Sequence, residues 1–163
     1  MFRRDNISIL LAAYLLLALT MSRHAQAQFT LSEAKEIGAI PLSVEKVQKM
    51  YRVAGALRPA VPLSTHYQTL EEHIQAVQRV PNAENLCRAE GLSVREFVMI
   101  GMALGIAENP INNPAYRASP DQKTSDPMVV ADSPEHIKFV QDHLAEIEKA
   151  MSVLDDSAKN GHK

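Results

Sequence analysis

Residues 91–107 read GLSVREFVMIGMALGIA, and this stretch decides the fold. Ser93 followed by Glu96 has the pattern of a helix capping box, so a helix is expected to begin here. The eleven residues from Phe97 to Ala107 that follow include no polar side chain. In a soluble protein, a helix that is apolar on every side lies at the centre of other helices. The sequence therefore predicts an all-α protein, a single small multi-helix bundle with this apolar helix at its centre.

Helical periodicity continues through most of the remaining chain. Ser43 and Ser133 stand where helix N-caps are expected, and Ser32 is a further candidate. Pro134 suits the first turn of a helix, and Gly91 suits a left-handed C-terminal cap. The predicted helices besides the central one cover residues 31–37, 44–57, 65–80, 83–89 and 134–154.

The last predicted helix carries a continuous apolar seam, in which apolar residues alternate at spacings of three and four. We expect this seam to pack against the central helix, with a homodimer contact as the alternative. Its members are Ile137, Val140, Leu144, Ile147, Met151 and Leu154.

Gly101 and Gly105 lie about one turn apart inside the central helix. Each glycine costs about 1 kcal/mol of helix propensity relative to alanine. Small residues allow neighbouring helices to approach closely, so we expect a packing reason for both.

Two segments lack any period. Residues 109–132 are interrupted by several prolines and are predicted to form an irregular loop, either functional or flexible. Residues 155–163 are polar and are expected to form a flexible tail. The prolines of the loop are Pro110, Pro114, Pro120 and Pro127.

The N-terminal residues 1–27 have the order of a secretory signal peptide. Arg3 and Arg4 precede an uncharged run over residues 7–20, which is shorter than the roughly 20 residues of a membrane span. Small residues then stand at the first and third positions before the predicted cut. We therefore expect an exported helical domain of residues 28–163, in a periplasm or secreted, with no membrane anchor after cleavage. The cleavage site is defined by Ala25, Ala27 and Gln28.

The charge of the expected mature domain argues against nucleic acid as a partner. Removal of residues 1–27 reduces 17 basic and 19 acidic residues to 14 and 18, a net charge of −4. The charges are interspersed, and no basic stripe is present to follow a phosphate backbone.

The candidate reactive residues form no catalytic, cofactor-binding or metal-binding motif. Cys87 is the single cysteine, so an internal disulfide is excluded, and a buried free thiol or a cross-link between two chains remains. Two pairs of histidines are seven residues apart, too far for both rings to hold one metal on a helix. His143 with Glu146 is the closest approach to a ligand pair. We accordingly expect no cofactor.

Several segments resemble those of small uncharacterised exported bacterial proteins with an all-helical fold. The similar parts are residues 42–47, the Gly-Leu-Ser-x-x-Glu-Phe turn over residues 91–97, and the Ser-Pro-Glu start of the last helix at residues 133–140. The resemblance implies export and a helical fold, and it implies no activity and no site residues.

These observations favour a non-enzymatic, exported, stress-related or interaction protein that binds an unknown protein partner or a second copy of itself. The alternative is a carrier of small hydrophobic molecules, with a cavity among Met99, Met102, Leu104 and Ile106. An enzyme or a metal protein is the second alternative.

Overall fold

The computed structural model describes residues 30–57, 69–112, 131 and 133–160. The predicted signal peptide, with Ala25, Ala27 and Gln28, lies outside the described residues. The described part contains seven α-helices and no strand, which confirms the predicted all-α class. None of these helices is both long and apolar enough to span a bilayer. The helices are α2 (Leu31–Ala39), α3 (Val44–Leu57), α4 (Leu70–Gln78), α5 (Ala83–Ala89), α6 (Val94–Asn112), α8 (Pro134–Asp142) and α9 (Leu144–Asn160).

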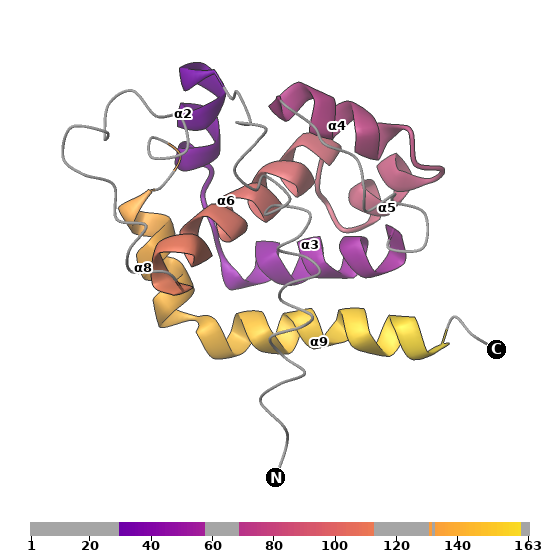
Figure 1. Cartoon of the computed structure of the whole chain (residues 1–163). Helices are drawn as coiled ribbons and strands as arrows, with labels where there is room; N and C mark the ends of the chain where they lie inside the picture. Colours follow the sequence, from indigo (N-terminus) through magenta and orange to yellow (C-terminus); the bar gives the residue numbers. More distant parts are fainter. Residues whose placement is uncertain (1–29, 58–68, 113–130, 132, 161–163) are drawn as a thin grey trace, which may run out of the picture.

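Helix α6 lies at the centre of the bundle, as its composition predicts. Figure 1 shows α3 below it, α2 and α4 above it and α8 at its side, and α5 also packs against it. Ile100 and Ala103 are completely buried, and Leu104 nearly so. Full burial of a large aliphatic side chain contributes about 1.5–3 kcal/mol, so α6 supplies much of the driving force for folding.

The chain reaches α6 through a corner whose hydrogen bonds end α5. Gly91 has a φ of 71°, the left-handed conformation predicted for it. Its N–H donates to the carbonyl of Arg88 (3.0 Å), and the N–H of Leu92 donates to the carbonyl of Cys87 (2.9 Å). These are the two bonds of a Schellman motif, and they satisfy carbonyls that the end of α5 would otherwise leave unpaired.

The predicted caps of α3 and α6 are both present. The Glu96 N–H donates to Ser93 Oγ (3.1 Å), while the Ser93 N–H donates to the Glu96 carboxylate (3.0 Å). At the start of α3, the Lys46 N–H donates to Ser43 Oγ (3.2 Å). Each bond satisfies a backbone donor that a helix N-terminus leaves unpaired.

Helices α2 and α4 share a carboxylate at their N-termini. Thr30 and Thr69 each form a capping box, with Glu33 and Glu72 as their respective acidic partners. The second carboxylate oxygen of Glu33 also accepts the N–H of Leu70 (3.1 Å). One glutamate therefore caps two helices that are distant in the sequence.

The predicted N-cap of α2 and the predicted start of α4 differ from the structure, whereas α2 begins at Leu31 as predicted. Thr30 caps α2, and Ser32 lies inside that helix. Helix α4 begins at Leu70, because Thr69 has an extended backbone (φ −124°, ψ 159°) and acts as the N-cap. Residues 65–68 of the predicted helix lie outside the described residues. A glutamate follows three residues after Thr30 and Thr69 and completes a capping box at each, whereas Lys35 stands at that spacing after Ser32.

Two predicted boundaries of irregular structure also change. Helix α6 continues to Asn112, so residues 109–112 of the predicted loop are helical. Pro110 removes one backbone donor, but only two helical residues follow it, so little of the helix is lost. Helix α9 extends to Asn160, so residues 155–160 of the predicted tail are helical as well. Residues 113–130 lie outside the described part.

The apolar seam of the last helix is divided between two helices. His143 (φ −121°, ψ 25°) separates α8 from α9, so the prediction of one straight helix is wrong. Val140 and Ile147 are buried on either side of the break, whereas Leu144 between them is 48% exposed. The bend allows α8 to pack against α6 while α9 packs against α3.

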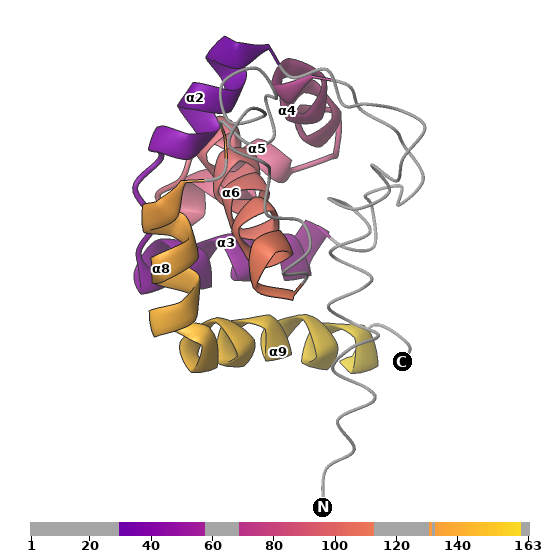
Figure 2. The ribbon, with the colours of Figure 1, turned by 60° about the vertical axis from the view of Figure 1, so that its left-hand side comes forward.

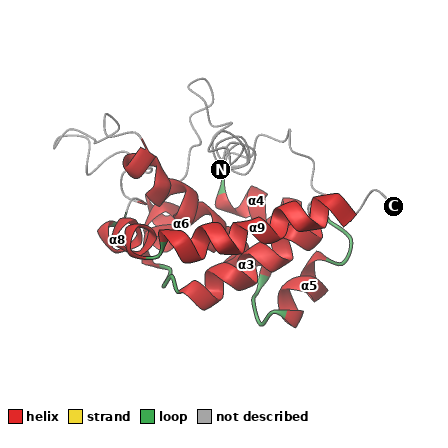
Figure 3. Cartoon of the chain, turned by 90° about the horizontal axis from the view of Figure 1, so that it is seen from below, coloured by secondary structure: helices red, strands yellow, loops and turns green. Residues whose placement is uncertain are grey.

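Helix α9 forms an outer layer on the bundle. Figure 1 shows α3 and α9 extending in the same direction, and the view from below in Figure 3 shows α9 lying along α3. Figure 2 shows α8 meeting α9 at a steep angle at one corner. The expectation that the whole segment from Ile137 to Leu154 packs against the central helix therefore holds for α8 alone.

The packing reason expected for Gly101 is not found. A Cβ atom built on Gly101 would meet no atom within 4 Å outside its own helix and neighbours, so no helix approaches closely there. The glycine thus carries its cost in helix propensity without a contact that requires it.

Gly101→Ala is expected to raise the free energy of unfolding by about 0.5–1 kcal/mol, because alanine restricts the unfolded chain and fits the space. Urea unfolding followed by circular dichroism measures the change. Gly91→Ala is the matched control and should destabilise by about 1–2 kcal/mol, since its φ is left-handed. Destabilisation by Gly101→Ala would show that this position is more crowded than the structure indicates.

Candidate functional site

The histidines of the described residues serve mainly structural contacts. His136 is 5% exposed, and its Nε2 lies 2.7 Å from the carbonyl of Ile40. A carbonyl only accepts, so Nε2 carries the hydrogen and joins α8 to the α2–α3 connection. His73 Nδ1 donates in the same way to the carbonyl of Thr69 (2.9 Å), and burial lowers the pKa of this ring.

The predicted pair of His143 and Glu146 is in contact, at 3.7 Å between Nδ1 and a carboxylate oxygen. A stable metal site needs at least a third protein ligand. Within the described ranges no three His, Cys, Asp or Glu side chains are grouped to hold a metal ion. His66, one of the histidines spaced at seven, lies outside these ranges.

Cys87 is completely buried beneath the corner between α5 and α6. Burial raises the pKa of its thiol, so the reactive thiolate form is disfavoured. The sequence left open a buried free thiol or a cross-link between two chains, and in the structure Cys87 is a buried free thiol.

The residues predicted to line a hydrophobic cavity belong to the core. Met99, Leu104 and Ile106 are buried, and Met102 packs against the same core. A pocket formed by described residues on another part of the bundle is lined by none of the four.

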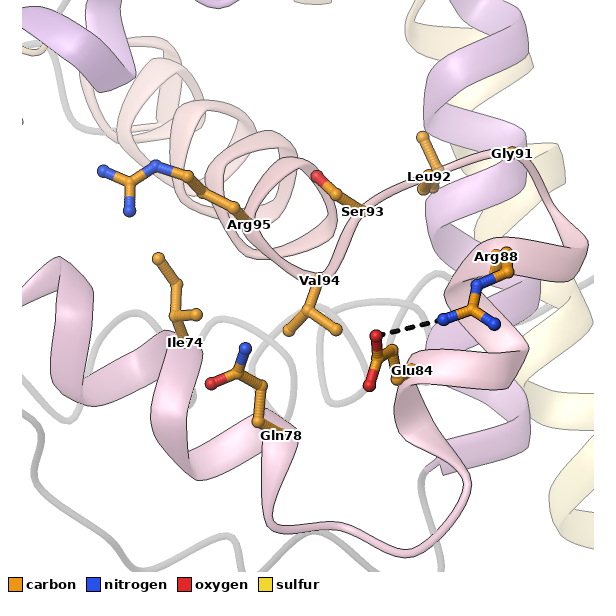
Figure 4. Close-up of a pocket in the computed structure, with 9 residues that line it drawn as sticks. All are labelled: Ile74, Gln78, Glu84, Arg88, Gly91, Leu92, Ser93, Val94 and Arg95. Atoms are coloured by element: carbon orange, nitrogen blue, oxygen red, sulfur yellow. Dashed lines mark hydrogen bonds and ion pairs between the residues drawn. The ribbon is translucent and has the colours of Figure 1, made fainter.

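This pocket lies where α4, α5 and the start of α6 meet, and its volume is about 440 Å³. Figure 4 shows Val94 between Ile74 and Gln78 of α4 on one side and Glu84 and Arg88 of α5 on the other. Together with Leu92, the aliphatic residues form a floor that is itself buried. The lining residues are Ile74, Gln78, Glu84, Arg88, Gly91, Leu92, Ser93, Val94 and Arg95.

The α5 wall of the pocket is formed by an exposed ion pair. Arg88 Nη2 lies 3.1 Å from a Glu84 carboxylate oxygen, with the two side chains 72% and 75% exposed. Exposed pairs of this kind contribute only about 0–1 kcal/mol, so either partner can turn to a ligand at little cost.

Arg95 fixes the opposite edge of the pocket. Its guanidinium donates to both carboxylate oxygens of Glu36 on α2 (2.8 and 2.6 Å) and reaches Glu71 on α4 at 3.4 Å. The hydrogen bond and charge of Arg95 lower the pKa of Glu36. This network joins α2, α4 and α6 at the edge of the pocket and leaves Arg95 little freedom to bind a ligand.

A buried carboxyl group lies elsewhere on α6, nearer its C-terminal end. Glu108 is 8% exposed, and burial raises its pKa to about 7. The sequence pattern did not single out this residue, because the apolar run ends directly before it. Glu108 follows Leu104 by four residues and Ile100 by eight, and this spacing indicates that all three lie on the same face of the helix.

The comparisons assign no family to this chain: no protein-family model matches it, and neither does a curated protein or a solved structure. The similarity to small exported bacterial proteins therefore stays a prediction. The geometry of the pocket is the strongest guide to function.

Cys87 should not react with iodoacetamide in the folded protein at about pH 8, because its sulfur is inaccessible and its thiol resists ionisation. Mass spectrometry measures the modification, and the same protein in denaturant should be modified completely. Rapid labelling of the folded protein would contradict the buried position of Cys87.

Proposed function

We propose that this chain is a non-enzymatic interaction protein, exported from the cell, that binds a segment of a partner protein in the pocket between α4, α5 and α6. The proposal combines the predicted signal peptide with the geometry of that pocket. The observation that carries it is the combination of an aliphatic floor with a neutral rim of mixed donors and acceptors.

The rim suits a polypeptide backbone. Gln78 offers both a donor and an acceptor, Glu84 accepts and Arg88 donates, so these three side chains have no net charge. A peptide main chain presents alternate N–H and carbonyl groups and needs partners of both kinds. A strongly anionic or cationic ligand would instead require a rim with an excess of one charge.

The floor suits one aliphatic side chain of the bound segment. Ile74, Leu92 and Val94 are the aliphatic residues that line the pocket, and each is only 4–6% exposed, so the floor can contact no more than a small apolar group. Small-molecule pockets enclose most of their ligand, whereas the walls of this pocket are largely exposed. An open depression that accepts a single anchoring side chain is typical of protein interfaces.

Arg88→Glu is expected to weaken binding of a peptide with an aliphatic anchor by about tenfold or more, because the rim gains a second carboxylate beside Glu84 and loses the guanidinium donor. Peptides selected from a random phage-displayed library supply the probe, and fluorescence polarisation measures the dissociation constant. The stability of the protein should change little, since the lost ion pair is exposed.

Lys138→Glu is the matched control, because Lys138 forms the same kind of exposed pair with Asp142 on α8, away from the pocket. This variant should bind the peptide as the original protein does. Equal weakening by both substitutions, or a selection that yields no aliphatic consensus, would contradict the proposal. A second copy of the chain as the preferred ligand would appear as concentration-dependent dimers that Arg88→Glu abolishes.

A further inference from the structure

Glu108 occupies a position where an apolar residue is expected. It follows Ile100 and Leu104 at intervals of four on one face of α6, and both of those side chains are buried. A carboxyl group in such a place destabilises the fold when it is ionised unless it has a partner. Its 8% exposure still allows exchange of a proton with solvent.

No basic group compensates this carboxyl within the described part of the chain. Burial is the only cause of its raised pKa, and no ion pair engages it. The charged groups of α3 and α8 pair elsewhere, as Lys46–Glu96, Lys49–Glu45, Arg52–Glu90 and Lys138–Asp142, and Glu135 accepts from Ser133. The Nε2 of His136 donates to Ile40, and its buried Nδ1 has no hydrogen-bond partner among the described residues, so it does not engage Glu108 either.

Most charged groups on the remaining neighbours of α6 are engaged as well, and Lys35 of α2 is an exposed side chain. On α2 and α4, Glu36 and Glu71 pair with Arg95, while Glu33, Glu72 and His73 take part in capping or backbone hydrogen bonds. On α5, Glu84 pairs with Arg88. Tyr51 of α3 and Cys87 of α5 are buried titratable groups, and neither influences the pKa of Glu108.

The helix itself also disfavours the charge. Glu108 lies close to the C-terminal end of α6, which ends at Asn112. The aligned peptide dipoles place partial negative charge at that end of a helix and repel a carboxylate. Geometry and helix polarity therefore both favour the protonated form.

We propose that Glu108 is a proton-operated latch: its neutral carboxyl holds the C-terminal turns of α6 in the core, and loss of the proton to solvent favours a locally opened form. Figure 1 shows α8 beside this end of α6, so opening would separate these two helices. The latch is independent of the proposed binding function, because the pocket lies at the other end of α6.

The direction of the pH dependence follows from the shift. The folded-state pKa of Glu108, about 7, is above the ordinary value of 4.5. The protonated form therefore stabilises the closed state fully below about pH 4.5, and this stabilisation is lost as the pH rises through about 7.

Hydrogen exchange of the amides in residues 104–112 tests the latch, with Glu108→Gln as the neutral variant of the same shape. The ratio of protection factors, original over variant, should fall by a factor on the order of 70 between about pH 5 and about pH 8.5. Glu84→Gln, at an exposed site on α5, should leave the pH trend unchanged. A constant ratio, or an equal loss of protection throughout α3, would overturn a local latch.

Carbon-13 NMR titration of Glu108 in the unmodified chain supplies a second measurement that does not depend on the variant folding. The carboxyl signal should titrate with a midpoint near pH 7, and amide signals of residues 104–112 should shift with the same midpoint. A midpoint near the ordinary glutamate value would overturn the proposal.

Discussion

The apolar surface of α6 has to be removed from water on every side, and the rest of the structure depends on this constraint. A helix with one apolar stripe needs one neighbour, whereas α6 requires several, and α2, α3, α4, α5 and α8 supply them. Most of these helices are too short to be stable in isolation, so they fold because they cover α6. The bundle is accordingly a layer of short helices around one long apolar helix.

The two ends of α6 differ in how they meet polar groups. At the N-terminus, the capping box of Ser93 and Glu96 and the ion pairs of Arg95 satisfy polar groups near the surface and leave an open pocket between short helices. Toward the C-terminus, Glu108 lies within the core without such partners in the described part. The pocket proposed to bind a partner and the carboxyl group proposed to respond to pH therefore lie toward opposite ends of α6.

Features fixed within a single helical turn were predictable from the sequence. Ser93 with Glu96, Ser43, and the left-handed Gly91 depend on neighbouring residues alone, and all three were predicted correctly. The cap at Thr30 obeys the same rule and was within reach, because Glu33 follows at the right spacing.

Features set by distant residues were not predictable. The bend at His143 arises because α8 and α9 cover different helices, and the heptad spacing by itself favours one straight helix. The open space beside Gly101 depends on how the neighbouring helices are placed around α6. The pocket likewise depends on how α4, α5 and the start of α6 are arranged in three dimensions. Glu108 could be seen in the sequence, but the lack of a basic neighbour for it in the described part of the chain could not.

The carboxylate of Glu33 has a consequence for cooperativity. It accepts hydrogen bonds from the first backbone groups of both α2 and α4. Fraying of the α2 end therefore removes an acceptor from α4, and fraying of the α4 end removes a donor that holds the Glu33 carboxylate in place. The two ends are then coupled in free energy although 37 positions separate Glu33 from Leu70. Local unfolding in proteins proceeds in contiguous cooperative units, and this single side chain assigns the starts of α2 and α4 to the same unit.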